Sequence, residues 1–147
     1  MTDWTDAEVT AAVTDTILDY AEFVDTCEAD QWADLFCENG VFDEGSIIEG
    51  RENLRVHVRK LLRLFDATAH HISNVRVTRT GDETADARCY VYAWHQRTNG
   101  DHFEIWGRYL DELRLEDGRW RFARRRVEMF GSRGWDIPLE RVQRREL

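Results

Sequence analysis

The stretch that decides the fold runs from Thr84 to Phe130 and reads TADARCYVYAWHQRTNGDHFEIWGRYLDELRLEDGRWRFARRRVEMF. Two turn signals, Asn99-Gly100 and Asp117-Gly118, divide it into three segments in which apolar and polar residues alternate. Asparagine, aspartate and glycine tolerate positive φ, so both pairs are typical of tight β-hairpins. We therefore predict antiparallel strands over residues 84–98, 102–116 and 119–130.

The residues before this stretch follow a helical period first and a strand period afterwards. Thr5 and Glu8 form a capping-box pattern, and apolar residues at helical spacing follow it, so we predict a helix over residues 6–27. Further helices are predicted over residues 29–36, ended by Asn39-Gly40, and over residues 51–65. A short strand is predicted over 41–43 and a long one over 68–80, joined to the next strand by Gly81-Asp82. Residues 131–147 predict a surface tail with one helical turn at 138–146.

This order of elements predicts an α+β fold, because helices come first and a run of antiparallel strands follows. The predicted strands are about 13 residues long, whereas strands of about 5–6 residues are usual. Strands of that length must twist and curl. We therefore predict a single domain over residues 1–147. It would be a cone-shaped barrel, in which a curved antiparallel or mixed sheet packs against three N-terminal helices and encloses a pocket.

Charge and composition exclude several classes of partner. The formal net charge is −9, whereas a domain that binds nucleic acid is expected to be basic, so we expect no nucleic-acid partner. No apolar run approaches the length of a membrane span, and we expect no membrane association. The first residues are acidic and polar and carry no secretory signal pattern. The three cysteines form no CxxC pair, which fits a reducing, cytoplasmic protein.

Sequence motifs for metal, nucleotide and serine-hydrolase chemistry are also absent. The five histidines lack ligand spacing such as HExxH, so we expect no metal site. The sequence has neither a glycine-rich phosphate loop nor a GxSxG nucleophile elbow. Nucleotide binding and serine-hydrolase chemistry therefore find no support in the sequence.

Three stretches are similar to one known family. Residues 17–36 read ILDYAEFVDTCEADQWADLF, residues 68–74 read TAHHISN, and residues 107–122 read GRYLDELRLEDGRWRF. On these stretches the chain resembles the NTF2-like superfamily and, within it, the SnoaL-like group. That group includes scytalone dehydratase, hexachlorocyclohexane dehydrochlorinase and bile-acid 7α-dehydratase. The resemblance covers residues 10 to 130, but the fold hosts many unrelated activities.

The resemblance implies a catalytic Asp–His pair in a conical pocket. The family aspartate matches Asp25, and the family histidine matches His70 in the pattern Thr68-Ala69-His70-His71-Ile72-Ser73-Asn74. Tyr20 matches a family tyrosine, and His95 matches a second histidine one strand later. A family arginine near the end of the last strand could correspond to Arg124, Arg125, Arg126 or Arg133. Relatives are commonly trimers, so a homo-oligomer is expected, with a trimer favoured over a dimer.

Acid–base chemistry follows from this pair of residue types. A carboxylate bonded to one imidazole nitrogen orients the ring and stabilises its cation, so His70 could serve as a general base oriented by Asp25. We expect a cofactor-independent lyase, of the dehydratase or dehydrohalogenase type, acting on a small hydrophobic alicyclic or aromatic substrate. Tyr20 or His95 would polarise a carbonyl or protonate the leaving hydroxyl. An isomerase or polyketide cyclase would use the same pocket, and a non-catalytic subunit like those of ring-hydroxylating dioxygenases would need no such pair.

Helical and strand periodicity indicates which side of its helix or strand each candidate residue faces. Asp25 lies about 140° from Tyr20 on a helical wheel, so it can reach the pocket only if the helix crosses the cone mouth or ends by residue 25. His71 should point to the opposite face from His70. His95 shares strand parity with the small apolar residues before it. The predicted substrate-binding residues are Tyr109, Trp106, Phe23 and Arg125; Tyr109 and Trp106 differ in parity, and Tyr109 is favoured.

Overall fold

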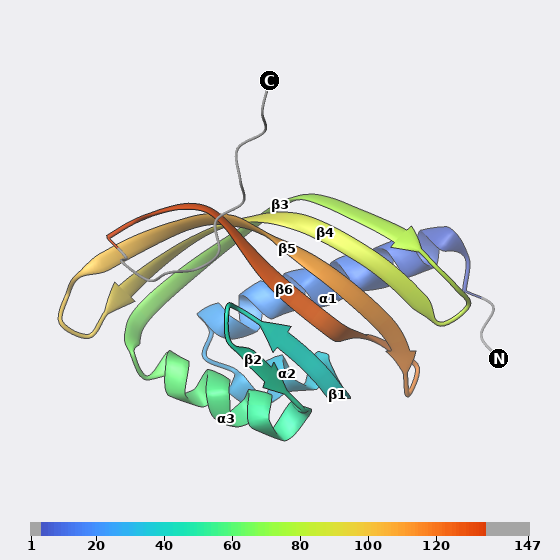
Figure 1. Cartoon of the computed structure of the whole chain (residues 1–147), viewed down its shortest axis with the longest axis horizontal. Coiled ribbons are helices and arrows are strands. Elements are labelled where there is room, and N and C mark those ends of the chain that lie inside the picture. The colour runs from blue at the N-terminus through green and yellow to red at the C-terminus, as the bar shows by residue number, and fades with distance from the viewer. Residues whose placement is uncertain (1–3, 135–147) are drawn as a thin grey trace.

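The computed structural model describes residues 4–134, which form three helices and six strands (Figure 1). The helices are α1 (Asp6–Asp25), α2 (Ala29–Asp34) and α3 (Arg51–Leu62). The strands are β1 (Phe36–Asp43), β2 (Ile47–Glu49), β3 (Phe65–Arg79), β4 (Thr84–Arg97), β5 (His102–Glu116) and β6 (Arg119–Arg133).

The six strands form one mixed sheet in the order β2-β1-β6-β5-β4-β3. The pairing of β1 with β6 is parallel, and the other pairings are antiparallel. The sheet arches over the helices, which lie on its concave side, and it stays open between β2 and β3 (Figure 1). The predicted α+β architecture with a curved sheet on three helices is therefore confirmed.

Irregular pairings curve the long strands. The register shifts in β3 between Ser73 and Arg76, where Asn74 has a φ of 53°, and in β5 between Trp106 and Gly107. Such bulges bend a strand and increase its local twist. A Cβ atom on Gly107 would lie only 2.4 Å from the carbonyl oxygen of Glu128 in β6, so no other residue fits this bend without moving the backbone.

The core lies between the concave face of the sheet and the helices. The Thr5–Glu8 capping box is present at the start of α1, as predicted. The buried face of α1 follows the predicted period through Val9, Val13 and Ile17. Below the sheet this face meets an aromatic group that includes Trp32, Phe36, Phe42 and Phe122.

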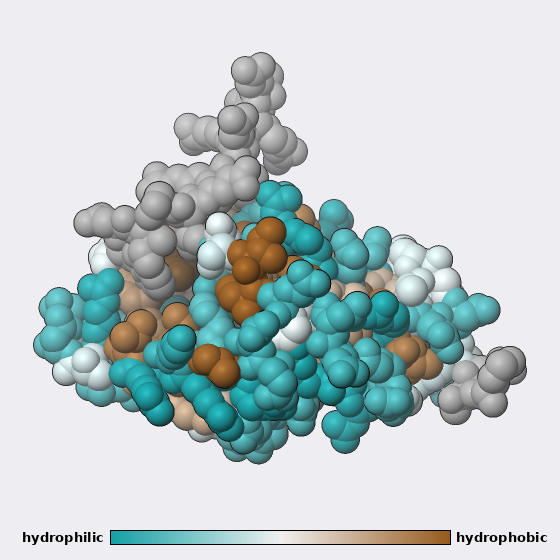
Figure 2. Space-filling view, turned by 60° about the horizontal axis from the view of Figure 1, so that its bottom comes forward, coloured by the Kyte–Doolittle hydropathy of each residue, from teal (hydrophilic) through white to brown (hydrophobic). Residues whose placement is uncertain are grey.

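No helix within residues 4–134 is long and apolar enough to cross a membrane. The face shown in Figure 2 is covered mostly by hydrophilic residues, and its apolar residues form small separate groups. This face therefore fits a chain in which a third of the residues are charged.

Several boundaries differ from the sequence predictions. α1 ends at Asp25 and α2 at Asp34, each two residues earlier than predicted, and β3 begins at Phe65 rather than at residue 68. β6 runs to Arg133, so residues 131–133 belong to a strand and not to the predicted surface tail.

β1 begins at Phe36 rather than at residue 41 and contains Asn39-Gly40, because Phe36 pairs with the distant Phe122 of β6. β2 was not predicted, since its three residues gain their partners only from β1. α3 ends at Leu62, and Phe65 already pairs with Arg97 in the sheet. The helical turn predicted at 138–146 lies outside the described residues.

Candidate active site

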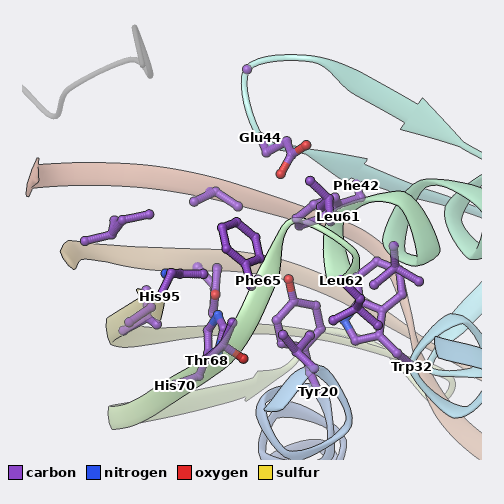
Figure 3. Close-up of a pocket in the computed structure, with 18 of the residues that line it drawn as sticks. Tyr20, Trp32, Phe42, Glu44, Leu61, Leu62, Phe65, Thr68, His70 and His95 are labelled. Carbon is purple, nitrogen blue, oxygen red and sulfur yellow. The ribbon is translucent and has the colours of Figure 1, made fainter. Parts of the chain in front are cut away.

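A cavity of about 420 Å³ opens between the concave face of the sheet, α1 and α3 (Figure 3). Its walls are mostly carbon, from side chains such as Trp32, Leu61 and Phe65. The polar side chains on the walls are few: Tyr20, Glu44, Ser46, Thr68, His70, His95 and Tyr109. An apolar cavity with a few converging polar groups is the usual form of a small-molecule site.

His70 lies on the cavity wall and is fixed by Asp25 from behind. Asp25 Oδ1 lies 2.7 Å from Nδ1 of His70, and Oδ2 accepts a hydrogen bond from the His70 backbone N–H at 2.8 Å. The Thr68 hydroxyl donates to Oδ1 at 2.7 Å. The side chain of His70 is only 8% exposed. This contact makes Nδ1 the engaged ring nitrogen and leaves Nε2 as the one that can meet a ligand.

Asp25 reaches His70 because α1 stops at this residue. The N–H of Glu28 donates a hydrogen bond to the carbonyl oxygen of Phe23 at 2.8 Å, and the N–H of Cys27 donates one to the carbonyl oxygen of Val24 at 3.2 Å. This is the Schellman arrangement, in which the residue after the cap takes a left-handed conformation. Here that residue is Cys27, with a φ of 61°. The structure thus meets one of the two conditions that periodicity set for Asp25, because the helix ends at residue 25.

The electrostatics of Asp25 favour its charged form. Burial acts to raise the pKa of Asp25, but the hydrogen bonds from the His70 ring, the His70 backbone and Thr68 outweigh it and lower the pKa. A carboxylate is otherwise disfavoured in the last turn of a helix, where the helix dipole is negative. Donors from β3 therefore stabilise a charge that the helix alone would not favour.

His95 lies beside His70 on the next strand. Its ring stacks on Phe103 with a centroid separation of 4.5 Å and meets the His70 ring edge-on at 5.2 Å. Burial, reinforced by the His70 charge, lowers the pKa of His95 to about 3. His95 is therefore neutral near pH 7 and can act there only as a neutral hydrogen-bonding group.

Two tyrosines complete the polar side of the cavity. Tyr20 points from α1 into the cavity (Figure 3), and its ring lies 5.5 Å from that of Tyr109. Burial raises the pKa of both hydroxyls well above their ordinary value. Both tyrosines are therefore protonated at neutral pH and can donate hydrogen bonds to a ligand oxygen.

Arg125 does not line the cavity, in contrast to the sequence prediction. Its guanidinium is fully buried and forms two hydrogen bonds of 2.8 Å with Asp111, its cross-strand neighbour on β5. It lies 4.1 Å from the ring centres of Tyr20, Tyr109 and Phe122. The Tyr20 and Tyr109 rings, which do line the cavity, thus lie between Arg125 and the cavity.

Two further predicted residues lie elsewhere. Phe23 lies at a surface depression beside α1 rather than on the cavity wall, although it is only three helical residues from Tyr20, and it packs against the core. Trp106 is 37% exposed on the outer face of the sheet, where its ring lies 5.6 Å from Tyr92, because it differs in strand parity from Tyr109. His71 also lies against Tyr92, at 5.6 Å, on the face opposite His70.

Several site residues were not singled out from the sequence. Thr68 had a usable signal, since it lies two residues before His70 and so shares its face of β3. Glu44 lies in the turn between β1 and β2, which has no period that could orient its side chain. The apolar wall from α3 (Val58, Leu61 and Leu62) looked like ordinary core from its spacing. In the part of the chain that the structure describes, no group of acidic, histidine or cysteine side chains could hold a metal ion.

We expect Asp25→Asn to destabilise the fold by about 1.5–3 kcal/mol at pH 7, because an amide cannot accept all the hydrogen bonds of a charged carboxylate. The folded pKa of Asp25 lies below its ordinary value of 3.8, so its contribution is present above that pH and is lost as the pH falls through the folded pKa. Urea unfolding at pH 7 and pH 3 checks this. The difference between wild type and variant should shrink at pH 3, and an equal difference at both pH values would contradict it.

Comparisons with known proteins agree with this architecture. The model of the SnoaL-like domain matches residues 5–126. A provisionally named scytalone dehydratase from Novosphingobium aromaticivorans DSM 12444 is 25% identical, over 99% of this chain and 100% of that one, with a TM-score of 0.91. A provisionally named aromatic ring hydroxylase from Novosphingobium aromaticivorans is 26% identical, over 90% of this chain and 96% of that one, with a TM-score of 0.85.

A hexachlorocyclohexane dehydrochlorinase, LinA type 2, shares the fold at 18% identity, over 90% and 92% of the two chains, with a TM-score of 0.78. The search of curated proteins found no match. Structural neighbours of this chain thus include proteins named as a dehydratase and a dehydrochlorinase. With most of its length matched by one domain model, the chain belongs to the SnoaL-like domain family.

Proposed function

We propose that the protein is a cofactor-independent lyase that removes water or a halide from a small hydrophobic ring compound. One observation carries the proposal: His70 lies on the wall of an apolar cavity, with Nδ1 held 2.7 Å from a carboxylate oxygen of Asp25. A histidine held in this way is arranged to take a proton at Nε2. The named activities of the scytalone dehydratase and LinA neighbours support the same class of reaction.

The elimination needs one base and one leaving group. Nε2 of His70 takes a proton from a carbon atom, and the electrons of that C–H bond form a C=C bond to the neighbouring carbon. The bond from that neighbour to its hydroxyl or halide breaks, and the leaving group departs with the electron pair. A departing hydroxide takes a proton from a donor on the cavity wall, such as the Tyr20 hydroxyl, and leaves as water. The proton on His70 then returns to that donor through solvent, or passes to solvent when the leaving group is a halide. Asp25 stabilises the imidazolium formed in this step and acts as a positioning residue.

The other polar groups can serve the leaving group or an activating carbonyl. Tyr20 and Tyr109 are protonated donors on the cavity wall, and either can hydrogen-bond an oxygen of the substrate. Neutral His95 can donate or accept beside His70. The cavity walls are otherwise apolar, which favours an alicyclic or aromatic substrate.

A panel of β-hydroxy and β-halo cyclic ketones and halogenated cyclohexanes tests the reaction class in D₂O. Elimination lowers the mass of the organic compound by that of water or of the hydrogen halide, which mass spectrometry detects, and ion chromatography detects the released halide. An isomerase would incorporate deuterium into these compounds without loss of a leaving group. An open-chain polyketone assayed beside the panel would reveal a cyclase, which joins two of its carbon atoms. The absence of any turnover, with a partner chain recovered on purification, would favour the non-catalytic subunit instead.

A further inference from the structure

Glu44 places a carboxylate on a cavity whose other walls are nearly all apolar. Of the described residues that line the cavity, Glu44 is the one acidic side chain, and none is arginine or lysine. Its side chain is 27% exposed, which fits a position at the mouth. Figure 3 shows it on the side of the cavity toward which Tyr20 points, away from the wall that carries His70 and His95.

The turn that carries Glu44 is anchored from both sides. The backbone N–H of Glu44 donates a hydrogen bond to the carbonyl oxygen of Ser46 at 3.2 Å. Next to it, Asp43 accepts from the N–H of Gly45 at 3.4 Å and from Arg124 of β6 at 2.6 Å. These contacts fix the backbone of the turn to the sheet, so the Glu44 side chain starts from a defined position.

One oxygen of the Glu44 carboxylate lies close to the imidazole ring of His57. Oε1 lies 2.8 Å from Nε2 of His57 on α3, whose ring also approaches Phe42 with a centroid distance of 6.3 Å. Nε2 of His57 is not aligned for a hydrogen bond with Glu44, so the two side chains are close neighbours and the carboxylate keeps its capacity to accept a hydrogen bond from a ligand.

The charge of Glu44 acts across the cavity. Burial is the main cause of the raised pKa of Tyr20, Arg125 opposes it, and Glu44 adds to it. The cavity thus holds tyrosine donors on one side and an anionic acceptor on another. A ligand with a carboxylate would meet like charge at Glu44, whereas a hydroxyl group would find an acceptor.

We propose that Glu44 accepts a hydrogen bond from a hydroxyl group of the substrate and rejects anionic ligands, so that the pocket takes neutral ring-shaped alcohols or phenols. This inference rests on the proposed function, because it specifies the substrate class of the same pocket. A purely structural role is the alternative, in which the Glu44–His57 contact only joins the β1–β2 turn to α3.

Binding of three unreactive ligands with one ring system separates the two roles. 2-Naphthol has a hydroxyl donor, 2-methoxynaphthalene has none, and 2-naphthoate carries a negative charge. Isothermal titration calorimetry at pH 7 should show wild type binding the naphthol at least tenfold more tightly than either of the other two. A preference of this size corresponds to about 1.4 kcal/mol, within the range of a hydrogen bond to a charged group.

Two variants then test the charge and the acceptor separately. Glu44→Gln removes the charge, and the naphthol-to-naphthoate affinity ratio should fall at least tenfold. Glu44→Ala removes the acceptor as well, and the preference for naphthol over its methyl ether should disappear. Glu49→Gln is the matched control, because it makes the same charge change on the exposed side of β2, and its ratios should equal those of wild type.

The outcomes are distinct. Unchanged ratios in both Glu44 variants, with only a lower melting temperature, would assign Glu44 to structure and overturn the proposal. Failure of wild type to bind any of the three ligands would overturn the substrate class. Because the ligands do not react, altered ratios without any lyase turnover would support Glu44 as the selecting residue and reject the elimination chemistry instead.

Discussion

Replacing His70 with glutamine is expected to lower the turnover of a lyase substrate by about 10²–10⁴-fold, the usual contribution of a general base. The glutamine amide at this position can still donate to Asp25, so the contact that holds β3 to the end of α1 is kept in part. What the variant lacks is a nitrogen that can take a proton from carbon. The kcat of the variant should therefore fall while the far-UV circular dichroism spectrum and the cavity stay as in wild type.

His71 offers a matched control for this experiment. It is the next residue on β3, but its ring lies on the opposite face of the sheet, against Tyr92. His71→Gln should leave kcat within a factor of about two, because surface substitutions that touch no special contact are usually mild. If both variants lost activity equally, the loss would reflect the strand rather than the base, and the role proposed for His70 would be wrong.

The sheet was predictable from local signals, and the errors came from distant pairing. Asn99-Gly100 and Asp117-Gly118 set two hairpins within a few residues, so β4, β5 and β6 appeared in the sequence almost as they are in the structure. β1 was placed too late because Phe36 finds its partner, Phe122, far along the chain in a parallel pairing. No local pattern records such a pairing, and the short apolar run before it fitted a helix equally well.

The candidate site shows the same division between local and distant causes. The sequence named Asp25 and His70 through family resemblance, but periodicity argued against Asp25, because it lies about 140° from Tyr20 on a helical wheel. The helix end that lets Asp25 reach His70 had no clear sequence signal, because the left-handed residue there is Cys27 rather than a glycine. Glycine at such a position is the usual signal for a helix end. Arg125 was expected at the pocket because the family resemblance implies an arginine near the end of the last strand, yet its cross-strand partner Asp111 keeps it behind the tyrosines. The pairing register, rather than residue type, decided its place.

That buried pair leads to the largest stability effect we expect. Asp111→Ala should destabilise the fold by about 3–5 kcal/mol, because it leaves the guanidinium of Arg125 buried without its counter-charge. Burial opposes the charge of Arg125, and Asp111 more than compensates by raising its pKa above the ordinary value. Urea unfolding followed by circular dichroism measures the loss. Replacing both partners, as Asp111→Leu with Arg125→Met, should cost less than Asp111→Ala alone.

A more exposed ion pair formed by the preceding residue of β6 serves as a control for the buried Asp111–Arg125 pair. Arg124 precedes Arg125 on this strand and binds Asp43 at 2.6 Å, but its side chain is 39% exposed. Asp43→Ala should therefore cost only about 0–1 kcal/mol, since solvent screens an exposed ion pair. Equal losses for Asp43→Ala and Asp111→Ala would mean that Arg125 escapes to solvent when its partner is removed. In that event Tyr20 and Tyr109 would lose the guanidinium packed between them, and affinity for a neutral ring ligand should fall together with stability.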